Sequence, residues 1–232
     1  MRNIEIPVVA IDGPSGSGKG TIGQLLAQRL GWNFLDSGAL YRAVGYAAEQ
    51  TGIDITDTAA LARLTHDMTI RFEPVPDRPV RVILNNAEVG EVLRTEAGGA
   101  AASKVAAIPE VRRALLDKQH AFRQLPGLVA DGRDMGTAVF PDAVLKVFLT
   151  ASPEIRAQRR YKQLKEKGFD ANLPQLLGEI RNRDARDAAR SASPLKPAAD
   201  ASILDTSALS IPEVVQQIED LLQAQLMGRR GR

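Results

Sequence analysis

The sequence predicts an α/β protein in which a parallel β-sheet is covered by helices on both faces. Short apolar runs alternate with helical patterns of ten or more residues over most of the chain, as in right-handed strand–helix–strand units. A glycine-rich stretch, residues 13–21, lies between the first apolar run and the first amphipathic run. The length of 232 residues suits one domain, or one core with insertions, that buries a sizeable hydrophobic core.

The strands of this sheet are expected where short apolar runs occur, in chain order at residues 8–11, 32–35, 127–130, 144–149 and 203–204. Helices are expected at residues 22–30, 39–50, 96–107, 109–123, 173–190 and 211–227, and after Ser152 and Pro153. Ser152 fits an N-cap, Pro109 and Pro153 fit first helical positions, and Gly31 and Gly52 fit helix ends. We expect residues 228–232 to form a frayed basic tail.

A different pattern interrupts this alternation at residues 69–89. Two short alternating segments, 69–72 and 80–84, are separated by the proline-bearing stretch 74–79 and followed by Asn85 and Asn86. Such a pattern predicts a small antiparallel hairpin or meander inserted into the strand–helix chain.

The glycine-rich stretch has the context of a phosphate-binding loop, because it joins a strand to a helix and carries a lysine at the start of that helix. Its residues, all predicted to bind a nucleoside triphosphate, are Gly13, Pro14, Ser15, Gly16, Ser17, Gly18, Lys19, Gly20 and Thr21. Glycines let successive N–H groups point at an anion, and the helix adds its positive end. A plain Gly/Ser connection is the alternative, which the lysine and both flanking elements disfavour. Gly20 occupies the place where Ser or Thr usually ligates Mg²⁺, so we expect phosphates and water to hold that ion, with Thr21 as a further candidate ligand.

Polar residues follow several predicted strands, at 36–37, 131–134 and 150–152, and ligands of parallel sheets bind at the carboxyl ends of strands. These segments should therefore meet at one cleft. A solvated ion pair is the ordinary interpretation of helical charges, and we adopt it for Asp184 and Arg186. We reject it for Arg133 at a strand end, and for the face of Arg183 both interpretations stay open.

The composition excludes several classes. There are no cysteines, so no disulfide framework or cysteine-based metal site is expected. The net charge is only +2 although the sequence pI is about 9.0, and no basic stripe alternates with aromatic residues, which disfavours nucleic acid and membrane partners. No signal-peptide or membrane-spanning pattern is present, so a soluble, cytoplasmic protein is expected. We also expect a monomer. His66 and His120 are expected in exposed helical positions and in no catalytic role.

Three segments resemble bacterial cytidylate kinases, members of the nucleoside monophosphate kinase family: residues 36–42, 131–137 and 183–190. The order Gly-Lys-Gly-Thr in the glycine-rich stretch is also similar to that family. The resemblance runs from this stretch to about residue 214. Gly90, Gly98, Gly99 and His120 depart from the family's pattern, which suggests a more flexible insertion.

The resemblance implies a P-loop NTPase-type fold with a core at 1–38, 108–152 and 173–232. A monophosphate-binding insertion at 39–107 would contain the small antiparallel sheet, and 153–172 would form a short lid. The implied activity is transfer of the γ-phosphoryl group of ATP, with Mg²⁺, to CMP and dCMP. This gives CDP or dCDP and ADP in pyrimidine nucleotide metabolism.

The resemblance also implies roles for individual residues. The residues implied to bind CMP are Ser37, Tyr41, Arg42, Ser103, Arg112, Asp131, Arg133, Asp134, Arg183, Asp187 and Arg190. Among them, Ser103, Arg112 and Asp134 would face the cytosine; Arg183 and Asp187 would hold the ribose; Arg42, Arg133 and Arg190 would hold the acceptor phosphate. The residues implied to act on the transferring phosphoryl group are Lys19, Arg133, Arg156, Arg159 and Arg160, the last three from the lid. No general base is needed, because a phosphate acceptor is already anionic.

Two alternatives remain open from the residues. The first is a kinase for another monophosphate or for a small hydroxylated metabolite, whose hydroxyl would favour a general base such as Asp36, Asp131 or Asp134. The second is a regulatory GTPase or a nucleic-acid-handling ATPase. The chain contains no Asn-Lys-x-Asp segment for guanine, which disfavours the GTPase.

Overall fold

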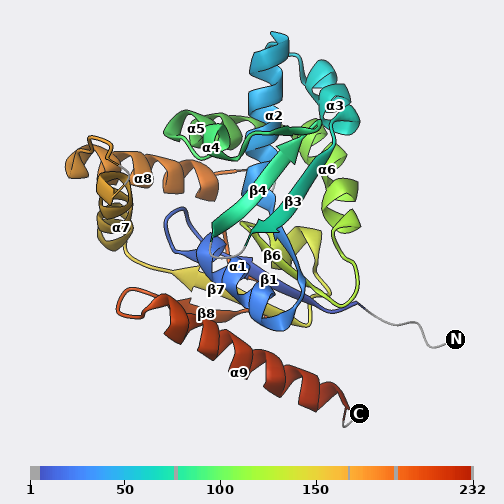
Figure 1. Cartoon of the computed structure of the whole chain (residues 1–232), viewed down its shortest axis with the longest axis vertical. Helices are drawn as coiled ribbons and strands as arrows, with labels where there is room; N and C mark the ends of the chain where they lie inside the picture. The colour runs from blue at the N-terminus through green and yellow to red at the C-terminus, as the bar shows by residue number, and fades with distance from the viewer. Residues whose placement is uncertain (1–5, 76–77, 167, 191–192, 231–232) are drawn as a thin grey trace, which may run out of the picture.

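A five-stranded parallel sheet forms the centre of the computed structural model, which describes residues 6–75, 78–166, 168–190 and 193–230 (Figure 1). The strand order is β2-β6-β1-β7-β8, and every neighbouring pair runs parallel. The strands are β1 (Val8–Asp12), β2 (Asn33–Asp36), β6 (Leu128–Gly132), β7 (Leu145–Thr150) and β8 (Ser202–Asp205). The predicted α/β class, and the place of each of the five strands, are confirmed.

Helices cover both faces of this sheet. The covering helices are α1 (Lys19–Leu30) and α9 (Ile211–Arg230) on one face, and α2 (Ser37–Thr51) and α6 (Pro109–Ala121) on the other. Alternate residues of β1 divide between the two faces: Val8 and Ala10 join the cluster of α2 and α6, whereas Val9 and Ile11 join that of α1 and α9. All four side chains are fully buried, so β1 is the centre of both hydrophobic cores.

Local signals begin and end the helices next to the sheet. The Asp36 carboxylate accepts a hydrogen bond from the Ala39 amide at 2.8 Å, so α2 begins two residues earlier than predicted. Gly31 and Gly52 end α1 and α2 with φ of 64° and 68°, a left-handed conformation that glycine adopts without strain. The Ser152 hydroxyl accepts from the Ile155 amide at 3.2 Å and caps α7 (Pro153–Glu166), as predicted.

The predicted antiparallel insertion is a three-stranded meander. Its strands are β3 (Ile70–Val75), β4 (Arg78–Leu84) and β5 (Ala87–Glu88). Asn85 and Asn86 form the turn between β4 and β5 with φ of 48° and 69°, values that asparagine tolerates better than most residues. Residues 76–77 of the proline-bearing stretch lie outside the described residues.

Some elements differ from the expectation. The structure adds α3 (Thr58–Asp67), α4 (Gly90–Leu93) and the π-helical turn η1 (Met135–Val139), while α5 (Glu96–Val105) and α8 (Leu173–Ala188) are each two residues shorter than expected. The helix α9 continues through Gly228 to Arg230, because one glycine costs a helix only about 1 kcal/mol. The frayed tail predicted at 228–230 is therefore wrong, and residues 231–232 lie outside the described part.

Glycines in the insertion serve close packing. A Cβ at Gly98 would lie 2.7 Å from the Leu93 carbonyl oxygen, a distance that no side chain tolerates. The glycine thus lets α5 begin directly against α4. Gly98 is a packing requirement at this position, rather than the source of flexibility that the sequence suggested.

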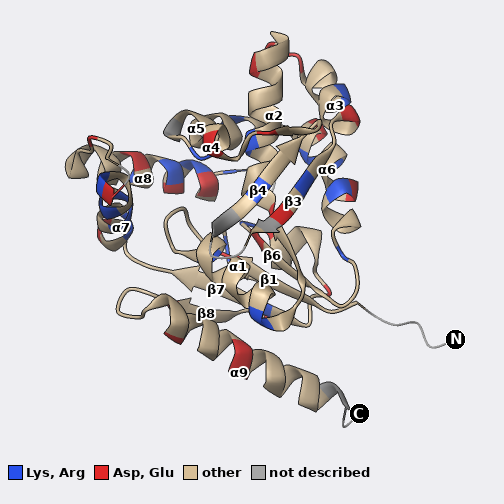
Figure 2. Ribbon diagram, in the orientation of Figure 1, with Lys and Arg blue, Asp and Glu red and all other residues tan. Residues whose placement is uncertain are grey.

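Helices α7 and α8 pack against each other at one side of the sheet, and α8 also contacts α5. Figure 2 shows that both helices carry many charged residues, which suits elements outside the hydrophobic core. The elements that surround the carboxyl ends of the strands are therefore α2 and α5, the α7–α8 pair and the glycine-rich loop (Figure 1).

Candidate active site

A cavity of about 320 Å³ opens at the carboxyl ends of β1, β2 and β6. Every residue predicted to bind CMP lines it: Ser37, Tyr41, Arg42, Ser103, Arg112, Asp131, Arg133, Asp134, Arg183, Asp187 and Arg190. Of the glycine-rich loop, Ser15, Gly16, Gly18, Lys19, Gly20 and Thr21 line it. Gly13, Pro14 and Ser17 are buried behind the loop. The predicted convergence on one cleft is confirmed for residues 36–37 and 131–134, whereas residues 150–152 at the end of β7 do not line the cavity. The individual roles of the lining residues stay predictions.

The glycine-rich loop needs its glycines for two reasons. Gly16 and Gly18 have φ of 78° and 89°, in the left-handed region. A Cβ at Gly13 would lie 2.2 Å from the Leu149 carbonyl oxygen, so only glycine fits where the loop leaves β1. The Lys19 ammonium and the Ser17 hydroxyl both donate to the Pro14 carbonyl at 3.0 Å, which braces the loop from within.

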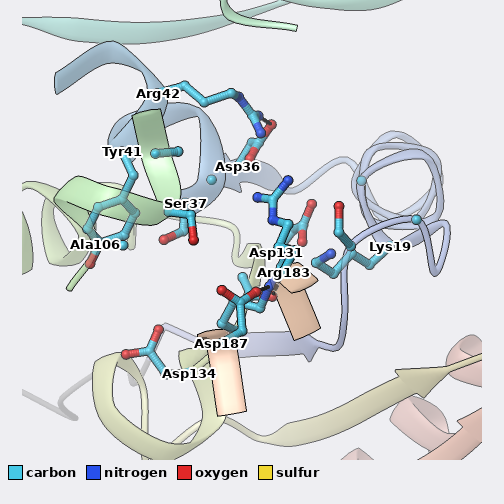
Figure 3. A pocket seen from close by; sticks show the side chains of 18 of the residues that line it. Lys19, Asp36, Ser37, Tyr41, Arg42, Ala106, Asp131, Asp134, Arg183 and Asp187 are labelled. Carbon is cyan, nitrogen blue, oxygen red and sulfur yellow. Dashed lines mark hydrogen bonds and ion pairs between the residues drawn. The ribbon is translucent and has the colours of Figure 1, made fainter. Parts of the chain in front are cut away.

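Lys19 and Asp131 are buried next to each other, and their environment acts against both charges (Figure 3). Burial raises the pKa of Asp131, while the neighbouring Lys19 lowers it. Burial, and then the charge of Arg133, lower the pKa of Lys19 to about 7. A Cβ at Gly20 would lie 3.2 Å from the Asp131 Oδ2 atom, so the missing side chain leaves room beside this carboxylate.

The first turn of α2 supplies one wall of the cavity. The Arg42 guanidinium donates to the Asp36 carboxylate at 2.8 Å, which holds both side chains at the rim. The Ser37 hydroxyl donates to Gln119 Oε1 at 2.8 Å, and both residues are buried. Gln119 was not predicted as a site residue. Its signal is visible in retrospect, because Val111, Leu115 and Gln119 lie on the same buried face of α6.

A second wall combines a paired and an unpaired polar group. The Arg112 guanidinium donates to the Asp134 carboxylate, and the Arg112 guanidinium carbon lies 5.8 Å from the centroid of the Tyr41 ring. Burial raises the pKa of the Tyr41 phenol to about 12, so the ring stays neutral. The buried Ser103 hydroxyl has no hydrogen-bond partner among the described residues. A buried polar atom of this kind points to a ligand that completes its hydrogen bonding.

A cluster of cations surrounds one buried aspartate of α8. Asp187 is 1% exposed and accepts from Arg133 at 3.0 Å and from Arg190 at 2.5 Å. Arg183, one turn earlier on α8, reaches the same cavity and lies beside Lys19 and Asp131 in Figure 3. This face of α8 therefore lines the cavity, and its role there stays a prediction.

The three arginines of α7 do not line the cavity. Arg156 is buried and donates to the Ala151 carbonyl at 2.9 Å, to the Ser15 carbonyl at 3.0 Å, and with two nitrogens to Asp184 at 3.0 and 2.5 Å. The interpretation of Asp184 as a solvated surface charge is therefore wrong, because Asp184 is the counter-ion of a buried arginine. The Arg159 guanidinium donates to the backbone and hydroxyl oxygens of Thr206.

Arg160 donates to Gln163 at 2.7 Å, and Gln163 lines the cavity. Arg186 is exposed, as expected. His66 is exposed, His120 contacts the Val139 carbonyl at 2.8 Å, and neither histidine lines the cavity.

The described residues contain no group of three or more His, Cys, Asp or Glu side chains placed to hold a metal ion. Within the same residues, no helix is both long and apolar enough to cross a membrane.

Comparisons of the sequence with a family model and with known proteins indicate one family. A family model described as cytidylate kinase matches residues 9–224. A cytidylate kinase from Stutzerimonas stutzeri (strain A1501) is 58% identical over 214 residues, which are 92% of this chain and 93% of that protein. A cytidylate kinase from Pseudomonas paraeruginosa (strain DSM 24068 / PA7) is 58% identical over 217 residues, 93% of this chain and 95% of that protein.

Proposed function

The chain belongs to the cytidylate kinase family and phosphorylates CMP with ATP, and we propose that the cavity at the carboxyl ends of β1, β2 and β6 is where transfer occurs. The observation that supports this most is the meeting of two sets of groups in one cavity. The phosphate loop with Lys19 approaches from one side, and the arginines around Asp187 approach from the other. Phosphoryl transfer needs the two reacting phosphates in line between such groups.

On the donor side, the loop amides and Lys19 bind the phosphates of ATP. A lysine held in a buried site is well suited to stabilise charge that moves from donor to product, because surrounding water does not screen it. The lowered pKa of Lys19 supports this role, since bound phosphates would restore its positive charge.

On the acceptor side, Arg42, Arg133 and Arg190 bind the phosphate of CMP, and Arg183 with Asp187 binds the ribose. Asp187 holds two of these guanidiniums before any ligand arrives, so they lose little freedom on binding. The phosphate oxygen of CMP is anionic and attacks without a general base. The charges of the arginines lower its repulsion from the γ-phosphate.

Asp134, Arg112 and Ser103 recognise the cytosine. Cytosine presents an amino donor beside a ring acceptor, so Asp134 accepts from the amino group and Arg112 donates to the ring nitrogen or carbonyl. Uracil presents a carbonyl where cytosine has its amino group, which would place two acceptors in contact. The unpartnered Ser103 hydroxyl gives the base one more hydrogen bond.

The phosphates of ATP and water would hold Mg²⁺, with Thr21, which lines the cavity, as a further candidate ligand. The residues fit such an ion. Gly20 leaves space beside Asp131, whose buried carboxylate would be stabilised in its ionised form by a hydrated cation. When bound, the ion neutralises charge on the β- and γ-phosphates.

We propose that residues 39–107 form the monophosphate-binding insertion and residues 153–172 the lid, around a core of 1–38, 108–152 and 173–232. Arg159 and Arg160 then exchange their present contacts with Thr206 and Gln163 for contacts to the phosphates on closure. We expect the chain to act as a monomer. We also expect dCMP to be a substrate.

The proposed recognition of cytosine by Asp134 is tested with the variant Asp134→Ala, whose catalytic efficiency is measured on CMP and on UMP. The variant should lose much more activity on CMP than on UMP. Asp142→Ala serves as the control, because Asp142 pairs with Arg123 at 2.7 Å outside the cavity lining. An equal fractional loss on both bases would show that Asp134 supports the phosphate site and reads no base.

A further inference from the structure

The last residue of β1, Asp12, has no role in the site described so far. It does not line the cavity and is only 4% exposed. Both of its carboxylate oxygens are nevertheless engaged: one accepts from the Met135 amide at 2.8 Å and the other from the Gly136 amide at 2.8 Å. These amides are the first two of η1, so a carboxylate on the central strand caps this turn from outside.

The residue that would ordinarily cap η1 is Asp134. An aspartate directly before a helical turn commonly accepts a hydrogen bond from the second or third amide of that turn. Asp134 makes no such bond, and its carboxylate pairs with Arg112 instead. The two carboxylates therefore have different roles: Asp12 accepts from the amides of η1, and Asp134 lines the cavity.

We propose that Asp12 is a positioning residue for base recognition: by capping η1 from β1, it leaves the Asp134 carboxylate available to the cytosine. This inference rests on the proposed function, in which Asp134 reads the base. If the cap were lost, the Met135 and Gly136 amides would be buried without an acceptor. Since such groups are costly, the Asp134 carboxylate would be drawn back toward them and away from Arg112.

The surroundings of Asp12 make the arrangement rigid. Asp12 pairs in register with Gly132 of β6, two residues before Asp134. A Cβ at Gly132 would lie 2.8 Å from the side chain of Met135, so the turn is packed tightly against the strand that precedes it. Asp12 also directly precedes Gly13, so the end of β1 holds both the phosphate loop and the turn that carries Asp134.

A double-mutant cycle tests the proposal. Asp12→Asn keeps the shape but turns an N–H group toward one of the two amides. This variant should lower the catalytic efficiency on CMP about tenfold or more, and it should lower the ratio of the efficiencies on CMP and UMP. The KM for ATP should change less than about twofold. In an Asp134→Ala background, Asp12→Asn should change efficiency on CMP by less than about twofold, because its effect acts through Asp134.

The control is Asp57→Asn, which removes a carboxylate cap from α3, where Asp57 accepts from the Ala60 amide at 2.9 Å outside the cavity lining. This variant should leave base preference unchanged. An equal loss on CMP and UMP in Asp12→Asn, or an undiminished loss in the Asp134→Ala background, would overturn the proposal. If Asp134→Ala alone fails to change base preference, the proposed reading of the base fails instead.

Should Asp12→Asn not fold by circular dichroism, the wild-type chain decides. Burial raises the pKa of Asp12 to about 6; the charged groups acting on it are Asp134, which raises this pKa, and Arg133, which lowers it. The Met135 and Gly136 amide resonances should shift together as pH falls through about 6, and KM for CMP should rise more than KM for UMP, whose phosphate takes up a proton in the same pH range. If the amides shift without a selective rise in KM for CMP, the cap exists but does not position Asp134.

Discussion

Removal of the charge of Asp184 should destabilise the whole chain. Asp184→Asn keeps the size of the side chain but leaves the Arg156 guanidinium, whose side chain is 3% exposed, without its counter-ion. Breaking a buried ion pair from one side costs about 3–5 kcal/mol. Asp184 is itself 28% exposed, and the Ser15 and Ala151 carbonyls would still accept from Arg156, so we expect a loss of about 2–3 kcal/mol.

The assay is urea unfolding followed by circular dichroism. A loss of this size corresponds to a Tm lower by about 4–12 °C for a chain of this length. The chain offers a matched control between the same two helices: Glu154 of α7 pairs with Arg181 of α8 at 2.7 Å, but both side chains are at least half exposed. Glu154→Gln should lower the free energy of unfolding far less than Asp184→Asn, because water screens an exposed ion pair. If Asp184→Asn costs no more than Glu154→Gln, the pair with Arg156 is no stabilising link and the reasoning fails.

Three further predictions concern the reaction. Lys19→Met should lower kcat by at least about 100-fold in a folded protein, since a preorganised charge in a buried site contributes about 3 kcal/mol or more; near-normal turnover would contradict its role, and the exposed Lys162→Met is the control. Arg159→Ala and Arg160→Ala should each lower kcat much more than they raise KM for CMP; a collapse of CMP affinity alone would place these arginines in the acceptor site. Because burial lowers the pKa of Lys19 to about 7 and bound phosphates would raise it, ATP binding should take up protons and weaken as pH rises above about 7; calorimetry in two buffers checks this, and proton release near pH 8 would contradict it.

The fold followed from local signals in the sequence. Strand β1 begins with a continuous apolar run, residues 8–11, and Gly31 and Gly52 mark helix ends through backbone conformations that few other residues adopt. The elements that were missed are short or weakly patterned. The turn η1 follows Asp134 in a stretch of five residues, too short for any helical period to be recognised.

Some residues of the site could be predicted from the sequence, and others were recognised only in the structure. The resemblance supplied the residues that line the cavity, because motifs carry residues that face a ligand. Asp12, Gln119 and Asp184 were missed or misread because their importance depends on what they contact. A buried carboxylate that caps a distant turn has no signature in its own neighbourhood, since its partners are more than 100 residues away.

The measurement that most directly tests the central claim is a coupled assay of phosphoryl transfer from ATP, with the purified chain, across CMP, dCMP, UMP, AMP and GMP. The account predicts formation of ADP and CDP with CMP as a preferred acceptor, a much lower catalytic efficiency on UMP, and loss of both activities in Lys19→Met. Equal efficiency on UMP or on a purine monophosphate would contradict the assignment of Asp134 and Arg112 to the base. Absence of any transfer to CMP would contradict the account as a whole.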